Sequence, residues 1–300
     1  MSFKSKHYIN KNKEIEVIEI FNKNSFAKII LNQGASLDVL LLNNSIIIKN
    51  LSPLSYKETY ASAILFPFAS RIKDGKYSYK NKQYQLSINE PQRNNAIHGL
   101  LYNKVFTIEE EILNKNSAKL VLTYDETKSS LGFPYLYKVK LEYILTEDNL
   151  SLTAHFTNTS NSTFPFTYGW HPYFYSENLL KSTLQFKPTQ KIVFNEQMIS
   201  KEFKNIQNEK KITINNKVLD DCYKLKDPKI LFSTPKYQLE INTTSRDNYL
   251  QIYTPSNTNS VAIEPVSGVS DSFNNKISLK ELKPGGSYSV KWNLHVITHL

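Results

Sequence analysis

The chain has 300 residues, of which 40% are hydrophobic and 12% aromatic, and this is enough to bury a large core. It contains no run of about 18 apolar residues, which excludes an ordinary transmembrane helix. Its one cysteine, Cys222, excludes an internal disulfide and a multi-thiolate metal site. Since the N-terminus also lacks a signal-peptide pattern, we expect a protein of the reducing cytoplasm.

The charge is strongly positive, because 37 Lys and Arg residues outnumber 27 Asp and Glu residues and give a formal charge of +10. Such an excess is compatible with nucleic acid, an anionic membrane or a phosphorylated substrate. However, the cations are nearly all lysines interspersed with polar and acidic residues, and only Arg71, Arg93 and Arg246 are arginines. Phosphate and nucleic-acid sites favour clustered arginines, so we predict a solvated basic surface with no nucleic-acid or membrane partner.

The sequence has no Pro-, Gly- or Ser-rich linker, no fixed-period repeat and no low-complexity tract, so we predict a single domain over residues 1–300. The longest hydrophilic stretch, Asn195–Asn216, is predicted as an inserted loop or short helix. Elsewhere the helical signal is weak, and Pro53–Ser62 is expected to hold one short helical turn.

Alternation of apolar and polar residues with a period of two dominates the chain and indicates β-strands. Ser78–Lys80 and Gln83–Leu86 flank Asn81 and Lys82, which predicts a hairpin with a turn-forming Asn. The other predicted strands are Ala118–Tyr124, Tyr137–Leu145, Leu150–Asn158, Tyr237–Ile241, Leu250–Tyr253 and Ser287–Val296. We therefore predict an all-β fold, a large antiparallel β-sandwich, in which Asn replaces the scarce Gly at left-handed turn positions.

Five polar residues stand in distinctive local sequences. They are Arg71 in FPFASRIKDGKY, His98 in NNAIHGL, His171 in TYGWHPYF, Asp220 in VLDDCY and Glu264 in VAIEPVSGVSDSFN. Two histidines and a glutamate are suited to acid–base chemistry near neutral pH. Taken alone, each of the first four is compatible with an ordinary surface, loop, core or turn position. Glu264 ends an apolar strand, where a carboxylate is costly to desolvate unless it has a partner or a task.

In this order, the five phrases resemble the aldose 1-epimerase (galactose mutarotase) family, which interconverts the α and β anomers of free sugars. The matching positions are Pro67, Arg71, Ile72, Gly75 and Tyr77, then Asn95, His98 and Gly99, then His171, Tyr173 and Phe174, and finally Glu264, Pro265, Asp271 and Asn274. Gly169-Trp170 replaces the Thr-Asn of better-known members, which leaves the identity of the sugar open, and Ser270 replaces a proline.

The resemblance implies a galactose mutarotase-like supersandwich and a reaction that needs no cofactor and no metal. Glu264 is implied to be the base at the anomeric hydroxyl and His171 the acid at the ring oxygen. His98 is implied to bind the ring-oxygen region and to share the proton. The sugar ring would open at the C1–O5 bond, rotate about C1–C2 and close on the other face.

Further residues are predicted to hold the sugar. The resemblance implies that Arg71 and Asp220 bind hydroxyl groups, with Asp221 as the alternative carboxylate. Asn95 and Trp170 are also placed among the substrate-binding residues, and Asn95 is expected to support His98. Gly99 is expected to allow a ligand to approach the backbone closely.

Two other functions remain open from the sequence. A hexose-6-phosphate 1-epimerase would need cations at the pocket rim, which the net charge favours and the scarcity of arginine opposes. A non-catalytic sugar-binding domain on the same fold would not need the acid–base set. A metal site is disfavoured, since His98 and His171 lack the spacing and the cysteines of structural zinc sites. The sequence leaves open whether the protein is a monomer or a homodimer.

Overall fold

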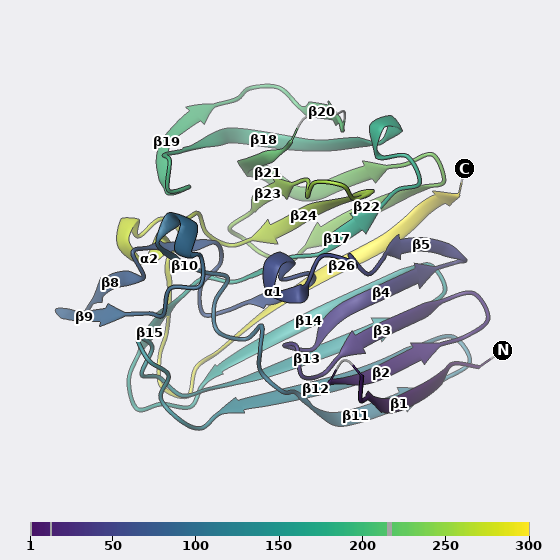
Figure 1. The fold of residues 1–300 in the computed structure, drawn as a ribbon, viewed down its shortest axis with the longest axis horizontal. Coiled ribbons are helices and arrows are strands. Elements are labelled where there is room, and N and C mark those ends of the chain that lie inside the picture. The colour runs from purple at the N-terminus through teal and green to yellow at the C-terminus, as the bar shows by residue number, and fades with distance from the viewer. Residues whose placement is uncertain (1, 13, 215–217, 300) are drawn as a thin grey trace.

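The computed structural model describes residues 2–12, 14–214 and 218–299. Its regular structure is almost entirely β, and two large antiparallel sheets face each other (Figure 1). This arrangement confirms the predicted all-β class and the predicted large antiparallel sandwich.

A five-stranded antiparallel sheet forms one layer, seen in front in Figure 1. Its strands pair in chain order: β1 (Lys4–Asn10), β2 (Ile15–Phe21), β3 (Phe26–Ile30), β4 (Ser36–Leu42) and β5 (Ser45–Ile48). Ile18, Ile20 and Ile29 point from this sheet into the core and have no exposed surface. Burial of one face of each strand against the other layer is what stabilises such a sandwich.

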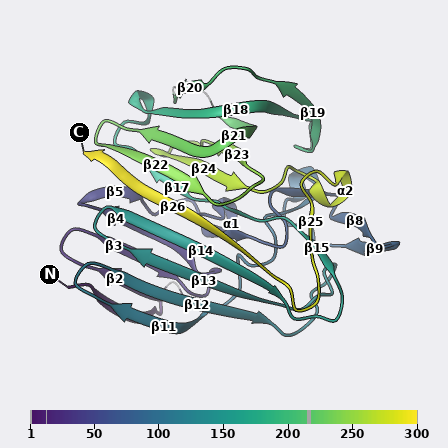
Figure 2. The same ribbon diagram turned by 180° about the vertical axis from the view of Figure 1, so that it is seen from behind.

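A 15-stranded sheet forms the other layer, seen in front in Figure 2. Its main path is β11 (Thr107–Leu113), β12 (Ala118–Glu126), β13 (Tyr137–Leu145), β14 (Asn149–Asn158), β26 (Ser287–His299), β22 (Tyr237–Thr243), β21 (Asp220–Ser233), β23 (Tyr249–Tyr253), β24 (Ser260–Val266), β16 (Gly169–Trp170) and β6 (Ile64–Leu65). Off this path, β17 (Tyr173–Tyr175) pairs with β24, while β18 (Thr183–Phe194) pairs with β21, β19 (Ser200–Asn205) and β20 (Lys210–Thr213).

Three pairs of short strands lie at one end of the sandwich (Figure 1). The pairs are β7 (Arg71–Lys73) with β10 (Asn95–Ile97), β8 (Lys76–Tyr79) with β9 (Lys82–Gln85), and β15 (Phe164–Phe166) with β25 (Lys280–Leu282). The helices are α1 (Tyr56–Thr59), α2 (Ser272–Asn275), and the 3₁₀ turns η1 (Pro91–Arg93) and η2 (Leu179–Lys181). Helix α1 confirms the short turn predicted within Pro53–Ser62. No helix in the described ranges has the length and apolar character needed to cross a membrane.

The core between the layers is rich in aromatic side chains. The ring of Phe66 stacks on Phe156 at a centroid distance of 4.2 Å and meets Tyr137 edge-on at 5.1 Å. Such pairs add to the stabilisation that burial of their large apolar surfaces provides. Phe66 leads directly into the Arg71 segment, so this packing fixes the start of the segment that carries one of the candidate site residues.

The predicted strands are confirmed within three residues at their ends, as β12, β13, β14, β22, β23 and β26. The predicted hairpin is also present, but its turn is formed by Lys80 and Asn81, one residue earlier than expected. Asn residues do take left-handed turn positions, as predicted: Asn43, Asn44, Asn81, Asn94 and Asn257.

The prediction of a loop or short helix for the hydrophilic stretch was wrong. Its described part, residues 195–214, contains strands β19 and β20, which both pair with β18; residues 215 and 216 lie outside the described ranges. Most side chains of these two strands are exposed or half-buried, so the apolar alternation that marks a strand is missing.

Candidate active site

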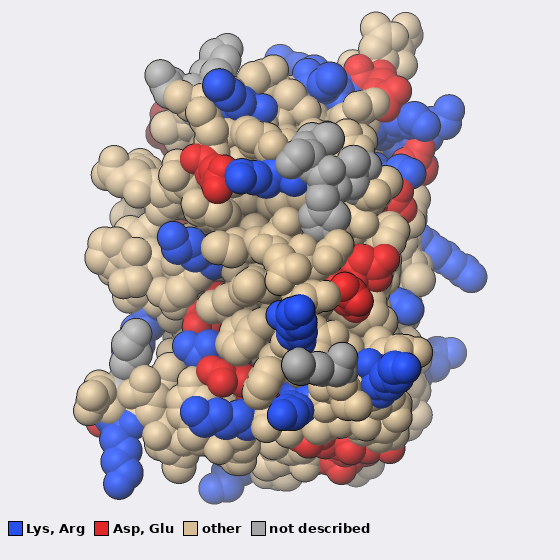
Figure 3. Space-filling view, turned by 90° about the vertical axis from the view of Figure 1, so that its right-hand side faces the viewer, with Lys and Arg blue, Asp and Glu red and all other residues tan. Residues whose placement is uncertain are grey.

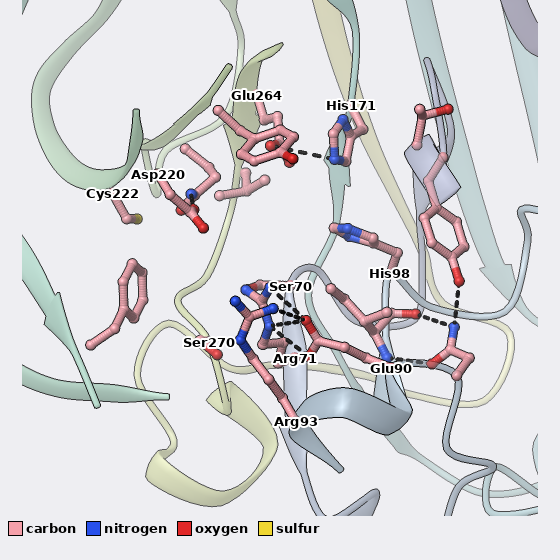
Figure 4. Close-up of a pocket in the computed structure, with 18 of the residues that line it drawn as sticks. Ser70, Arg71, Glu90, Arg93, His98, His171, Asp220, Cys222, Glu264 and Ser270 are labelled. Atoms are coloured by element: carbon pink, nitrogen blue, oxygen red, sulfur yellow. Dashed lines mark hydrogen bonds and ion pairs between the residues drawn. The ribbon is translucent and has the colours of Figure 1, made fainter. Parts of the chain in front are cut away.

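A cavity of about 420 Å³ opens beside β7, β10 and the ends of β21 and β24. Arg71, His98, His171, Asp220 and Glu264 all line it, although they come from five separate segments of the chain (Figure 4). Its volume lies within the range of about 300–1,000 Å³ that is typical of small-molecule sites. The fold thus brings together the five residues that the sequence phrases single out.

Glu264 lies on β24, in which every residue is buried. Its side chain is 4% exposed, and its Oε1 lies 3.5 Å from Nε2 of His171. Burial, assisted by the negative charge of Asp220, raises the pKa of Glu264 well above its ordinary value, while Arg71 acts in the opposite direction. The carboxyl group is therefore able to hold a proton at a pH where an exposed glutamate would have lost it.

His171 follows β16, and its backbone is held on both sides. Its N–H donates to the carbonyl of Ala63 (3.1 Å), and its carbonyl accepts from the N–H of Ser62 (2.8 Å). The imidazole stacks on Tyr173 at a centroid distance of 5.0 Å. Burial disfavours the imidazolium and lowers the pKa of His171 to about 3, with a further contribution from the positive charge of Arg71.

Oε1 of Glu264 and Nε2 of His171 lie 3.5 Å apart, so the protonation states of the two groups are considered together. A second proton would create a buried imidazolium, and loss of the last proton would leave a buried carboxylate beside a neutral imidazole. Burial opposes both changes, as the directions of the two pKa values show. The pair therefore retains a single proton over a wide pH range, which allows it to accept a proton at one atom and release one at another.

His98 presents its ring to the same cavity. Its φ of 65° is left-handed, and its N–H donates to the carbonyl of Ser70 (2.9 Å). The ring meets His171 edge-on at a centroid distance of 4.8 Å. Burial, with smaller contributions from His171 and Arg71, lowers the pKa of His98 well below its ordinary value. The imidazole is accordingly neutral near pH 7 and offers one hydrogen-bond donor or acceptor to a ligand.

The structure explains the glycine at position 99 differently from the expectation that a ligand approaches its backbone. Its φ is 75°, and a Cβ at this position would overlap the backbone of Phe66. Gly99 therefore allows its own backbone to lie close to the backbone of Phe66, and it does not serve the approach of a ligand. This backbone contact fixes the position of the adjacent His98.

Asp220, and not Asp221, faces the cavity. Asp220 accepts a hydrogen bond from Nε2 of Gln251 (2.7 Å), whereas Oδ1 of Asp221 lies 2.6 Å from Nζ of Lys191. Neighbouring side chains of a strand point to opposite faces, so only one of the two can point inward. Burial raises the pKa of Asp220.

Arg71 is anchored by a carboxylate that the sequence analysis did not identify. Its Nη2 donates to Oε1 of Glu90 at 2.8 Å and its Nε to Oε2 at 2.9 Å, while Nη1 of Arg93 donates to Oε1 at 3.1 Å. Glu90 and Arg93 also line the cavity. The only sequence signal was a Glu–Arg spacing of three around Pro91, which is too common to identify a site.

Two predicted substrate contacts are corrected by the structure. Asn95 has no exposed surface, and its Nδ2 donates to Glu90 (2.9 Å) and to the carbonyl of Gln197 (2.9 Å) rather than to His98 or the cavity. Trp170 also has no exposed surface and packs beside Trp292 in the core. Because neighbouring side chains of extended backbone point in opposite directions, His171 enters the cavity and Trp170 points away from it.

Two curated proteins of Escherichia coli (strain K12) are similar in sequence. The uncharacterized protein YihR is 24% identical over 280 residues, and the match covers 89% of each chain. The uncharacterized protein YphB is 33% identical over 110 residues, which cover 37% of this chain and 35% of that protein. These similarities establish relatives without indicating an activity.

Solved structures show the same fold. A galactose mutarotase-like protein from Clostridium acetobutylicum superposes with a TM-score of 0.88 at 21% identity, covering 100% of this chain and 99% of the other. A galactose 1-epimerase from Lactobacillus acidophilus NCFM gives 0.82 at 18% identity, covering 99% and 98%. The sequence model of the aldose 1-epimerase family matches residues 16–295, a range that contains every residue of the cavity. This chain therefore belongs to the aldose 1-epimerase family.

Proposed function

We propose that this protein is an aldose 1-epimerase that interconverts the α and β anomers of an unmodified hexose. The supporting observation is the placement of His171 Nε2 3.5 Å from Glu264 Oε1, beside a cavity of about 420 Å³. The anomeric hydroxyl and the ring oxygen are bonded to the same carbon, C1. Two adjacent groups that share one proton are suited to remove a proton from the first and deliver one to the second.

In this proposal, Glu264 accepts the proton of the anomeric hydroxyl while His171 donates its proton to the ring oxygen. The C1–O5 bond breaks, its electron pair remains on O5, and O1 becomes the oxygen of the aldehyde. After rotation about C1–C2, O5 attacks the opposite face of C1 and the two proton transfers are reversed. The directions of the two pKa values place the single proton of the pair on Glu264 before the reaction. The cycle therefore begins with transfer of that proton to His171, which leaves a carboxylate and an imidazolium, and the positive charge of Arg71 favours the carboxylate. The side chains supply each step, so we include no cofactor or metal.

The remaining cavity residues are assigned to holding the sugar. Arg71 donates to hydroxyl groups, Asp220 accepts from them, and neutral His98 binds near the ring oxygen. A carboxylate and a guanidinium can each contact two adjacent hydroxyls and so fix the ring. Fixing the ring keeps C1 aligned with the proton-transfer pair during opening and reclosure.

The charges around the cavity favour a neutral substrate. Among the described residues, the lining cations are Lys57, Arg71 and Arg93. The lining carboxylates are Glu58, Glu90, Asp220 and Glu264. Both arginines already donate to Glu90, so the cavity offers no excess of positive charge for a phosphate dianion.

We propose no nucleic-acid or membrane partner, and the distribution of charge on the surface supports this. On the face shown in Figure 3, the described Lys and Arg residues are interspersed with Asp and Glu rather than gathered in one basic patch. Many surface lysines also form ion pairs, such as Lys119 with Glu110 (2.8 Å) and Lys140 with Glu109 (2.9 Å). Mixed charge of this kind is typical of a solvated surface.

Polarimetry on freshly dissolved α-glucose, α-galactose and glucose 6-phosphate tests the proposed function. We expect faster mutarotation of a free hexose, with kcat/KM nearly equal at 0.1 M and 1 M salt. Recognition through neutral hydroxyls is insensitive to screening, although the Debye length falls from about 10 Å to about 3 Å. A preference for glucose 6-phosphate that is lost at 1 M salt would support the phosphosugar alternative. Hexose binding without accelerated mutarotation would support the non-catalytic alternative.

The pH dependence of kcat/KM should be unusually broad. Activity requires one proton on the Glu264–His171 pair. On the acid side, the second proton binds only far below pH 6.5, because the pKa of His171 is lowered to about 3. On the alkaline side, the last proton is lost above the ordinary carboxyl range, because burial raises the pKa of Glu264. Initial rates across this range check the expectation, and an acid limb centred near pH 6.5 would contradict it.

A further inference from the structure

We infer that Glu90 is a positioning residue of the proposed sugar site, because it fixes the guanidinium of Arg71 so that the remaining N–H groups face the sugar. The inference rests on the proposed function, since it concerns how the substrate of that function is held. Figure 4 shows Arg71 and Glu90 at one end of the cavity and Glu264 and His171 at the other.

Glu90 accepts hydrogen bonds from one edge of the Arg71 guanidinium. Nε of Arg71 donates to both carboxylate oxygens, at 2.9 Å and 3.1 Å, and Nη2 donates to Oε1 at 2.8 Å. No hydrogen bond within the described residues uses Nη1 of Arg71. A guanidinium is planar and rigid, so fixing one edge also fixes the direction of the other N–H groups. The Nη1 edge is consequently the part of Arg71 that is available to hydroxyl groups.

Glu90 is itself held firmly. Its side chain is 5% exposed, and fully buried Asn95 donates to its Oε2 at 2.9 Å. Burial is the largest influence and would raise the pKa of Glu90, but hydrogen bonds from Arg71, Asn95 and Arg93 outweigh it and lower the pKa. Asn95 also donates to the carbonyl of Gln197, in the turn between β18 and β19. The Glu90 carboxylate is therefore charged, buried and hydrogen-bonded on both oxygens where it contacts Arg71.

The contacts of Glu90 indicate that it acts through Arg71 rather than on the sugar. Its Oε1 accepts from Arg71 and Arg93, and its Oε2 accepts from Arg71 and Asn95, so both oxygens are engaged. Asp220, by contrast, accepts a side-chain hydrogen bond only from Gln251 among the described residues. Asp220 has acceptor capacity left for a hydroxyl group, and Glu90 does not.

The first test is Glu90→Gln, assayed by hexose titration calorimetry and by polarimetry. The amide removes the charge and turns an N–H donor towards the guanidinium, so Arg71 loses its fixed direction. We expect Kd and KM to rise about 10–100-fold, the range for hydrogen bonds to charged groups, with a smaller change in kcat. Glu90→Asp keeps the charge with a shorter reach and should lose less affinity than Glu90→Gln.

Glu126→Gln is the matched control. Glu126 is a 7% exposed carboxylate that accepts from Nζ of Lys104 (2.8 Å) and does not line the cavity. The substitution removes a comparable buried ion pair and should leave Kd and KM unchanged. If Glu90→Gln and Glu126→Gln have equal effects on Kd and KM, the inference is overturned.

A double-mutant cycle tests whether Glu90 acts through Arg71. In an Arg71→Ala background, Glu90→Gln should change Kd less than about twofold, because the guanidinium that Glu90 positions is absent. Effects that multiply would overturn the inference. If hexoses bind without anomer interconversion, the proposed function fails, whereas the cycle on Kd still decides the role of Glu90.

A crystal structure of Glu90→Gln gives an answer that is independent of any substrate. We expect the Arg71 guanidinium to leave its present direction while the backbone of β7 stays in place. A guanidinium that keeps its direction without the carboxylate would overturn the inference, whatever the activity of the variant.

Discussion

Glu264→Gln should lower kcat about 10²–10⁴-fold while the fold and the sugar affinity stay close to those of the wild type. Gln has the size of Glu but accepts no proton, so the anomeric hydroxyl loses its base. The neutral amide needs no desolvation of a charge at this 4% exposed position, and burial already raises the pKa of Glu264. Polarimetry on a fresh α anomer, thermal unfolding and titration calorimetry measure the three quantities.

Glu240→Gln is a suitable control for this substitution. Glu240 lies on β22 in the same large sheet, and its carboxylate pairs with Lys229 outside the cavity. Its replacement should leave kcat unchanged. A Glu264→Gln variant with a near wild-type rate would remove Glu264 from the role of base. A variant that has lost sugar affinity instead would show that Glu264 mainly holds the substrate.

Strands with one face in the core were predictable from the sequence. Along β13 (Tyr137–Leu145), buried and half-buried side chains alternate without interruption, because one face packs on the five-stranded sheet. The N-terminal sheet lacks this signal. Val17 and Ile18 of β2 are both fully buried, since a small apolar cluster with Ile15 and Ile30 covers the second face. A strand that is buried on both faces does not show the period of two.

The sequence identified the candidate site better than it oriented the individual side chains. The five phrases named the residues that meet in the cavity, but they also contain Trp170 and Asn95, whose side chains point elsewhere. Which of two neighbours faces inward depends on strand register, which local sequence does not show. Glu90, which precedes η1, was missed because its role depends on the approach of Arg71 from strand β7.

His171→Asn should lower kcat by a similar factor, about 10²–10⁴, because the ring oxygen loses its proton donor. His155→Asn is the matched control. His155 lies on β14, and its Nδ1 shares a hydrogen bond with Oγ of Ser289 (2.7 Å) outside the cavity. Polarimetric rates should be normal for the control. A His171→Asn variant that retains near wild-type activity would transfer the role of acid to another group, and His98 is the adjacent candidate.

The residual activity of His171→Asn should rise at alkaline pH, whereas the activity of the wild type should fall. In the wild type, activity falls at alkaline pH because the pair loses the proton that His171 must donate. In the variant, Glu264 titrates alone, and it acts as a base only after it has lost its proton. Because burial raises the pKa of Glu264, this ionisation occurs above the ordinary carboxyl range, and the residual rate should rise through it. Initial rates of both proteins at matched pH values measure the two slopes. If the variant keeps a falling alkaline limb, the proton whose loss ends wild-type activity does not belong to the Glu264–His171 pair.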